Sequence, residues 1–156
     1  HLVLSWIVTQ GTIWKIDMDR NAFFWQVQDG KLPPPKAAAT LGMTVIKVDT
    51  DAGVLEADFE GSEAFCNPAG NIQGGFLSAM LDDTMGPALA AQLAAGEFAP
   101  TLNLNVQFLA PARPGKLKGI GRVDRRGGGV GFLSGELYQG DRLVAKATAT
   151  AAIRKL

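Results

Sequence analysis

The sequence predicts an α+β domain in which an antiparallel sheet of about six strands accompanies one long, mostly buried helix. Residues 75–94 place apolar side chains around most of the helical circumference, which is typical of a helix covered on several sides. Residues 102–109 alternate between apolar and polar side chains, as a half-exposed strand does. Turn residues at 49–53 and 140–141 separate further strand-like runs, as in β-hairpins. One helix among antiparallel strands defines the α+β class.

The other elements are expected in the following order. A first helix begins at Asp19, which can cap it, and ends at Gly30. Three prolines at 33–35 then enforce an extended connection before a short helical turn at 37–41. The remaining strands are expected at 43–48, 54–59, 116–123, 130–139 and 142–153, with a turn at 125–129.

Composition limits the class of protein. The 156 residues are enough for one domain with a sizeable core. Fifteen basic and fifteen acidic residues give zero formal charge, so nothing in the overall charge favours nucleic acid or an anionic membrane as a partner. The single cysteine, Cys66, excludes an intrachain disulfide and a cysteine-built zinc site.

Histidine occurs only at position 1. Mechanisms that need an internal histidine are therefore excluded, including Ser-His-Asp catalysis, Cys-His catalysis and histidine-ligated zinc. An enzyme with this sequence works with carboxylates, amides, hydroxyls and backbone N–H groups. We expect no metal and no cofactor.

The first 17 residues are expected to be an arm foreign to the native domain, which then spans 18–156. The alternative is a native, exposed N-terminal arm. No apolar run approaches the ~18 residues needed to cross a membrane, and no basic leader precedes one. These observations favour a cytoplasmic location.

Asp82 and Asp83 interrupt the apolar helix. Adjacent helical residues point about 100° apart, so at most one of the two shares a given apolar face. A carboxylate that is partly buried beside a cleft is a candidate general base or nucleophile. The alternative is that both face solvent.

Gln73-Gly74-Gly75 opens the same helix. Glycines let a ligand approach closely, and the first N–H groups of a helix lack internal partners. Such groups can polarise a carbonyl and hold an oxyanion. The alternative is an ordinary glycine-rich loop before a helix.

The spacing from Asn67 through Gln73-Gly74-Gly75 to Asp82-Asp83 resembles the hotdog-fold acyl-CoA thioesterases of the phenylacetate-pathway (PaaI-type) group. The resemblance extends from about residue 19 to 153 and includes Leu32-Pro-Pro-Pro and the Asn105-Val-Gln-Phe-Leu-Ala-Pro strand end. It implies a sheet wrapped around the long helix, a homodimer or homotetramer, and an active site at the dimer interface. It also implies hydrolysis of an acyl-CoA thioester to a free acid and CoA.

The resemblance also implies roles for individual residues. The Gly74 N–H would polarise the thioester carbonyl, and Asp82 would act as nucleophile or as general base for water. Asn67 would help to hold the carbonyl or the water, and Thr101 would orient the water. Asp82 would come from the subunit opposite to the one that supplies Asn67 and Gly74.

One position departs from the pattern. Many relatives carry His-Gly-Gly where this chain has Gln73-Gly74-Gly75. Glutamine retains hydrogen-bonding capacity but does not titrate, which weighs against the histidine-dependent hotdog dehydratases. The alternative function is a non-catalytic hotdog protein that binds acyl-CoA as a sensor or scaffold.

Substrate contacts are expected at two groups of residues. Arginine suits the phosphates of CoA, and the basic residues that lie close in sequence are Arg113, Lys116, Arg125 and Arg126, with Arg113 and Arg126 favoured. The acyl group would contact Gly75, Phe76, Met80 and Met85. The alternatives are solvated turn residues for the first group and plain core for the apolar members of the second.

Overall fold

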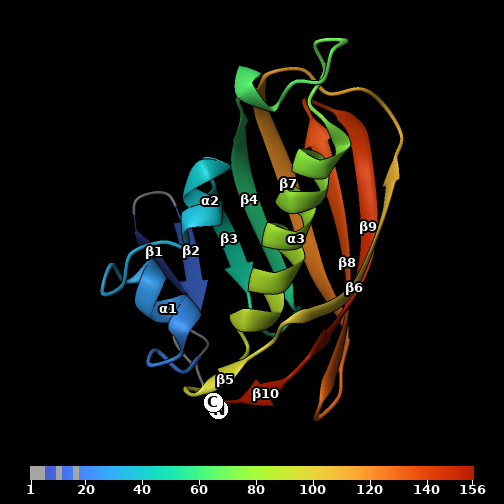
Figure 1. Cartoon of the computed structure of the whole chain (residues 1–156). Coiled ribbons are helices and arrows are strands. Elements are labelled where there is room, and N and C mark those ends of the chain that lie inside the picture. Colours follow the sequence, from blue (N-terminus) through green and yellow to red (C-terminus); the bar gives the residue numbers. More distant parts are fainter. Residues whose placement is uncertain (1–5, 10–11, 16–17) are drawn as a thin grey trace.

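The computed structural model describes residues 6–9, 12–15 and 18–156, and Figure 1 shows a sheet that curves around one long helix. The helices are α1 (Phe23–Gln28), α2 (Lys36–Thr40), the 3-10 helix η1 (Glu63–Phe65) and α3 (Gly74–Ala90). The strands are β1 (Trp6–Thr9), β2 (Thr12–Lys15), β3 (Thr44–Asp49), β4 (Val54–Gly61), β5 (Glu97–Phe98), β6 (Thr101–Phe108), β7 (Gly115–Arg126), β8 (Val130–Gln139), β9 (Arg142–Ala152) and β10 (Arg154–Lys155).

Within the described residues, the main sheet has eight strands in the order β1-β2-β3-β4-β7-β8-β9-β6. The six strands from β3 to β6 in this order pair antiparallel throughout, which confirms the predicted class and sheet. β2 runs parallel to β3 and, with β1, extends that edge. The prediction of about six strands did not count β1 and β2 because it placed residues 1–17 outside the domain. That this segment is foreign to the domain stays a prediction.

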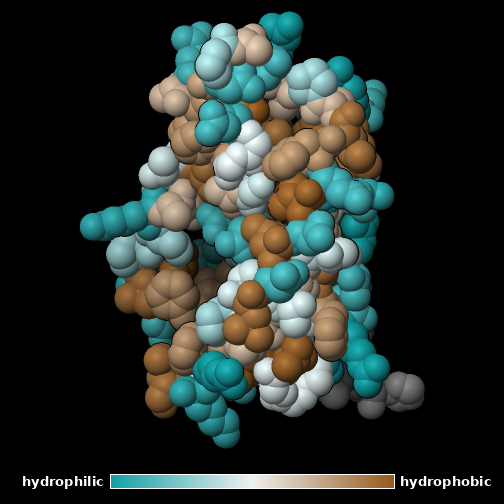
Figure 2. All heavy atoms as spheres, turned by 45° about the vertical axis from the view of Figure 1, so that its right-hand side comes forward, coloured by the Kyte–Doolittle hydropathy of each residue, from teal (hydrophilic) through white to brown (hydrophobic). Residues whose placement is uncertain are grey.

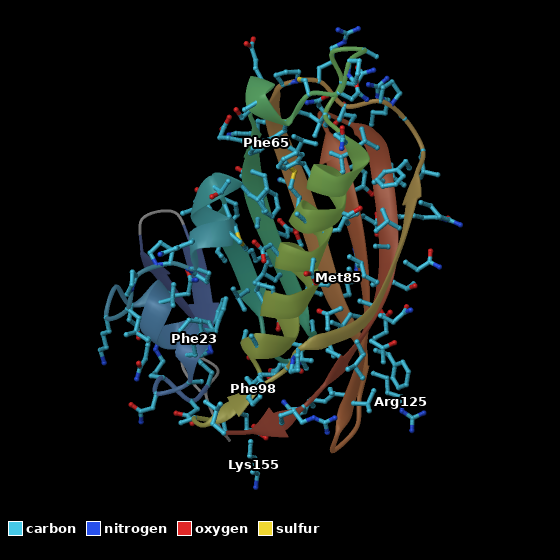
Figure 3. All side chains as sticks on the ribbon, viewed as in Figure 1. Phe23, Phe65, Met85, Phe98, Arg125 and Lys155 are labelled. Atoms are coloured by element: carbon cyan, nitrogen blue, oxygen red, sulfur yellow. The ribbon has the colours of Figure 1, made fainter. Side chains whose placement is uncertain are left out.

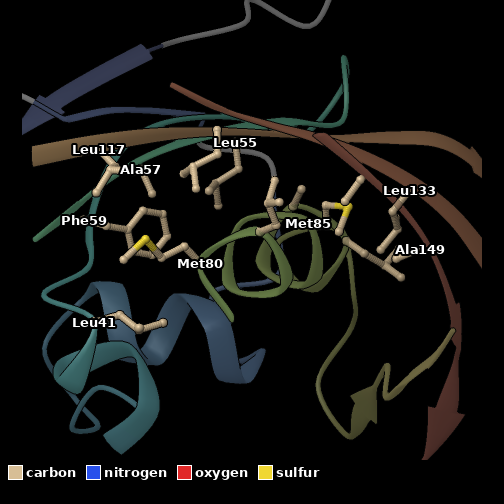
Figure 4. Close-up of a cluster of buried hydrophobic side chains, with 14 of the residues drawn as sticks. Leu41, Leu55, Ala57, Phe59, Met80, Met85, Leu117, Leu133 and Ala149 are labelled. Carbon is tan, nitrogen blue, oxygen red and sulfur yellow. The ribbon is translucent and has the colours of Figure 1, made fainter. Parts of the chain in front are cut away.

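Helix α3 packs across one face of the sheet against β4, β6, β7, β8 and β9. Its buried side chains include Met80, Leu81, Met85 and Leu89. Figure 4 shows Met80 beside Phe59 at one part of the cluster and Met85 near Leu133 at another. Burial of this apolar surface is the main stabilising contribution to the fold.

Glycines in β7 and β8 let α3 approach the sheet closely. A Cβ at Gly119 would overlap the Thr84 side chain, and a Cβ at Gly121 would overlap the Thr84 carbonyl. In β8, a Cβ at Gly135 would lie 2.9 Å from Cγ of Met85. Only glycine leaves room for the helix at these three positions, and we call Gly119, Gly121 and Gly135 the glycine track.

The N-terminal helix starts later than predicted. Asp19 does not cap it, because its carboxylate accepts hydrogen bonds from the N–H groups of Asn21 and Ala95. α1 begins at Phe23 after an Ala22 cap. The Trp25 indole N–H donates to the Ala91 carbonyl at 3.0 Å, which ties α1 to the end of α3.

Three further boundaries differ from the prediction. The central helix ends at Ala90 rather than near residue 94. Arg125 and Arg126 belong to β7 rather than to a turn. The short pair β5–β10 was not predicted. None of the described helices is long and apolar enough to cross a lipid bilayer.

Candidate active site

The first turn of α3 presents free backbone donors. Gln73 occupies the cap position with extended backbone and makes no side-chain cap bond. Within the described part of the chain, the N–H groups of Gly74 and Gly75 have no hydrogen-bond partner. They lie at the positive end of the helix dipole, which suits an oxygen that carries negative charge.

A cavity of about 390 Å³ opens beside these donors, and Asn67, Gly74, Leu77 and Phe108 are among the residues that line it. The Phe108 ring covers Gly74 so closely that a Cβ there would lie 2.9 Å from the ring. A side chain at position 74 would therefore have to displace the Phe108 ring, whereas glycine leaves the ring in place over the exposed N–H. The structure thus brings Asn67 and Gly74 together, as the resemblance implied.

The Asn67 side chain also shapes its own loop. Its Oδ1 accepts hydrogen bonds from the N–H groups of Ala69 at 3.0 Å and Asn71 at 3.2 Å. This leaves the amide NH₂ group, which has no partner within the described residues, free to donate to a ligand. Gln73 lies on the exposed side of the loop, next to Gly74.

Asp82 pairs with a residue from a different element. The hydroxyl of Thr101, the first residue of β6, donates to Oδ1 of Asp82 at 3.0 Å. The bond is partly buried and fixes one carboxylate oxygen while the other stays available. Two residues that the resemblance implied for one site therefore meet in space.

Asp82 does not line the Asn67–Gly74 cavity. Eight residues separate Gly74 from Asp82 along α3, which corresponds to about 12 Å of helix. One chain thus carries two half-sites: the donors at the start of α3, and the Asp82–Thr101 pair near its middle. A single thioester carbonyl cannot contact both half-sites of the same chain.

Asp83 faces away from the Asp82–Thr101 pair. It lines a separate cavity between α3, α1 and β3, and its buried Oδ2 has no hydrogen-bond partner in the described part of the molecule. Burial, with a smaller contribution from the neighbouring Asp82, raises the pKa of Asp83 to about 6. The sequence analysis did not single out this environment, although Asp83, Pro87 and Ala90 are spaced along one face of the helix.

Two of the residues predicted for the acyl pocket, Met80 and Met85, belong to the core, whereas Gly75 and Phe76 stay candidates. Met80 and Met85 are completely buried between α3 and the sheet. They are therefore core residues and not part of an acyl pocket. Phe76 stacks on Phe65 with ring centroids 4.2 Å apart. The apolar pattern of a helix shows which residues are buried but not which of them line a cavity.

The basic residues that are close in sequence do not form one cluster. Lys116 lies at the start of β7 and Arg113 in the loop before it, whereas Arg125 and Arg126 lie at the other end of the strand, about 30 Å from Lys116. Figure 3 shows Arg125 far from Phe65, which marks the end of the fold where α3 begins. The four residues therefore do not share one place within one chain, and their contact with CoA stays a prediction.

Their partners also differ. Arg126 donates to the Gln92 carbonyl at 2.8 Å and lies 3.9 Å from the Glu97 carboxylate. Lys116 lies 3.6 Å from the Asp58 carboxylate. The Arg113 side chain is exposed and has no ion-pair partner within the described residues, and its loop borders the Asn67–Gly74 cavity.

Residues 69–146 match the family model described as the thioesterase superfamily. The chain belongs to the thioesterase superfamily. This segment contains α3, with Gly74 and Asp82, together with Thr101 and much of the antiparallel sheet, whereas Asn67 lies two residues before it.

Relatives agree with this membership. A candidate thioesterase of Ralstonia eutropha JMP134, described as phenylacetic acid degradation-related, is 46% identical, with a TM-score of 0.82 over 83% of this chain and 98% of the other. A candidate esterase of Pseudomonas aeruginosa is 37% identical over 55% of this chain and 65% of its own length, so the match spans just under two thirds of that relative. The Escherichia coli PaaI protein shares the fold, with a TM-score of 0.74 and 20% identity over 90% of this chain and 96% of the other.

The hotdog fold and the PaaI-like resemblance are thereby confirmed, and superfamily membership supports a hydrolase. The roles of individual residues are not decided by these comparisons. They depend on the chemistry of the two half-sites.

Proposed function

We propose that this protein hydrolyses an acyl-CoA thioester to the free acid and CoA. The observation that carries the proposal is the pairing of Thr101 with Asp82 on the helix whose start bears free N–H groups. A carboxylate held by a hydroxyl can serve as nucleophile or base, and an oxyanion-binding helix end can stabilise the charge that develops, so together they suffice for acyl transfer without histidine.

The start of α3 supplies the electrophilic half of the mechanism. The thioester oxygen accepts a hydrogen bond from the Gly74 N–H, and the Asn67 amide donates a second. As a nucleophile adds to the carbonyl carbon, negative charge develops on this oxygen. The helix dipole and the two donors stabilise that charge.

Asp82 supplies the other half by one of two routes. As a general base it takes a proton from water, and the resulting hydroxide adds to the carbonyl carbon. Collapse of the tetrahedral intermediate breaks the C–S bond, and the CoA thiolate takes up the proton. As a nucleophile, Asp82 displaces the thiolate to form a mixed anhydride, which water then hydrolyses. In both routes Thr101 orients the reacting group.

The proposal requires two copies of the chain. Since the half-sites of one chain lie about 12 Å apart along α3, Asp82 of one copy completes the site with Asn67 and Gly74 of another. β6 is an outer strand of the sheet and carries the exposed apolar residues Leu102 (62% exposed) and Phe108 (53%), followed by Leu109 (52%). Figure 2 brings this side forward and shows apolar groups along the middle of the face. We propose this edge as the dimer contact.

The phosphates of CoA would contact Arg113, because its guanidinium is exposed and its loop borders the cavity that holds Asn67 and Gly74. Arg126 is a weaker candidate than the sequence indicated, since it is already held by Gln92 and Glu97.

The deciding experiment incubates the protein with aromatic, short-chain and medium-chain acyl-CoAs and detects the free thiol. We expect turnover of at least one substrate. Asp82→Ala is expected to lower kcat by two to four orders of magnitude, which is the usual contribution of a general base. Circular dichroism checks that the fold is kept.

Asp83→Asn is the matched comparison, because it alters the neighbouring carboxylate, which faces away from Thr101. We expect a much smaller loss of kcat in this variant. Wild-type turnover by Asp82→Ala would refute the assignment of Asp82. Binding of acyl-CoAs without turnover across the panel would support the alternative function, a sensor or scaffold.

A further inference from the structure

A second cavity lies apart from both half-sites. It has a volume of about 660 Å³, within the ~300–1,000 Å³ typical of small-molecule sites. Neither Asp82 nor Thr101 lines it. Its walls are mainly apolar and come from α1, the segment before and within α2, β3 and α3; they include Phe23, Phe24, Val27, Pro35, Met43 and Pro87.

One wall residue suggests what the cavity binds. Asp83 lies among these apolar side chains, and its Oδ2 is buried without a hydrogen-bond partner within the described residues. A carboxylate oxygen removed from water costs free energy unless a donor meets it. The structure therefore contains an acceptor that a bound donor would satisfy.

The surrounding charges limit the kind of donor. Asp82 adds a second negative charge next to Asp83, and the Asp29 carboxylate at the cavity is already paired with Arg20. Among the residues whose side chains the structure describes, no lysine or arginine lines the cavity. An anionic ligand would be repelled by Asp83, whereas a neutral donor or a cation would be attracted.

Aromatic walls favour a flat, apolar ligand. Phe23, which Figure 3 labels on α1, is 58% exposed although it borders the cavity. Covering such a ring with another ring removes apolar surface from water and gains the preferred aromatic contacts.

We propose that this cavity binds a small apolar molecule that presents one hydrogen-bond donor, a hydroxyl or an ammonium group, to the Asp83 carboxylate. The ring or chain of the ligand lies against Phe23 and Phe24, and its polar group meets Oδ2. The site is separate from the proposed thioester chemistry.

The test uses four probes that share one ring: benzyl alcohol, benzylamine, toluene and benzoate. Titration calorimetry or ligand-observed NMR at pH 7.5 measures their affinity for the full chain. We expect benzyl alcohol and benzylamine to bind at least tenfold more tightly than toluene, and benzoate to bind more weakly than toluene.

Two variants locate the site. Asp83→Leu is expected to remove the preference, so that benzyl alcohol binds no better than toluene. Ala90→Phe is expected to fill the cavity and to weaken all probes at least tenfold. Both variants are first checked for a folded thermal transition, and either of them alone tests the proposal.

Equal affinity of wild-type protein for benzyl alcohol and toluene would overturn the proposal, as would a preference that survives in Asp83→Leu. None of the probes contains a thioester. A failure here therefore leaves the proposed hydrolase untouched, and a failure of hydrolysis leaves this site untouched.

Discussion

Asp82 and Asp83 are neighbours in sequence but lie in different surroundings. The 100° step between adjacent helical residues points Asp82 to Thr101 on β6 and Asp83 to the cavity beside α1. Only Asp82 is held by a hydroxyl. The chemistry of each carboxylate is thus set by the element that it faces.

Removal of the Thr101 hydroxyl should impair catalysis while substrate binding is kept. A hydrogen bond to a charged group contributes about 1.5–3 kcal/mol, so we expect Thr101→Ala to lower kcat about tenfold or more with little change in KM. Thr101→Ser keeps the hydroxyl and should retain most of the activity. Steady-state kinetics on the best acyl-CoA measures both, and an equal loss in the two variants would contradict the role of the hydroxyl.

Asp83 should make stability depend on pH. Its folded pKa of about 6 lies above the ordinary value of 3.8, so the folded state binds the proton more tightly than the unfolded state does. The contribution of Asp83 to the free energy of unfolding therefore falls as the pH rises from about 4 to 6. Above pH 6 the carboxyl is charged in the folded state, and its full destabilising effect is present.

Asp83→Asn should accordingly be more stable than the wild type at pH 7.5, by about 1–2 kcal/mol once partial solvent screening is allowed for. The difference should shrink as the pH falls towards 4.5. Urea unfolding at several pH values measures it. A difference that stays constant with pH would contradict the assignment.

At the scale of elements, α3 and the glycines of β7 fix the geometry. Gly121→Ala would drive its methyl group into the Thr84 carbonyl, and backbone cannot move aside as a side chain can. Overpacking of this kind costs about 1–3 kcal/mol, and we expect a loss of at least about 2 kcal/mol in the free energy of unfolding.

Gly128→Ala is the matched control. A Cβ at Gly128 meets no atom within 4 Å, and the backbone there is not left-handed. The free energy of unfolding of this variant should therefore change by less than about 0.5 kcal/mol. Chemical denaturation of both variants gives the comparison. Equal stability of the two would show that α3 can shift away from β7.

The elements differ in how far local sequence determined them. β8 begins and ends as predicted, at Val130 and Gln139, because its pattern and its flanking turns agree. The predicted start of α1 was wrong because the Asp19 carboxylate accepts a hydrogen bond from the Ala95 N–H. Residues so far apart in sequence cannot be paired from a local pattern. β5 and β10 pair over two residues each, too few to produce a pattern.

The candidate site, like the fold, could be predicted from the sequence only in part. The resemblance placed Asp82 and Thr101 in one site, and the structure joins them by a hydrogen bond. The cavity at Asp83 could not be predicted, because its walls come from several elements that only the fold brings together. Lys116 and Arg125 lie close in sequence but near opposite ends of β7, because an extended strand rises about 3.3 Å per residue.

At the scale of the whole molecule, the proposed function makes hydrolysis a property of an assembly, because the two half-sites of one chain are separated. Asp82→Ala removes one half-site, and Asn67→Asp removes the amide donor of the other while keeping the Oδ1 acceptor of its loop bonds. Each variant alone should be impaired. A mixed dimer would contain one intact site, built from Asp82 of one chain and Asn67 of the other.

Mixing equal amounts of the two variants under conditions of subunit exchange should therefore restore about a quarter of wild-type activity, since half of the dimers are mixed and each has one working site. Light scattering or native mass spectrometry confirms the exchange. Activity that stays at the mean of the separate variants after exchange would contradict a site shared between chains.

The glycine track beneath α3 has a consequence for how this scaffold diversifies. Because Thr84 and Met85 lie against glycines, the helix cannot slide or rotate without a collision, and Asp82 therefore keeps its position relative to the sheet. Changes in substrate preference then fall to α1, α2 and the 109–114 loop, which border the cavities but lie outside the track. Substitutions in these peripheral segments can then change the cavities while α3 stays in place.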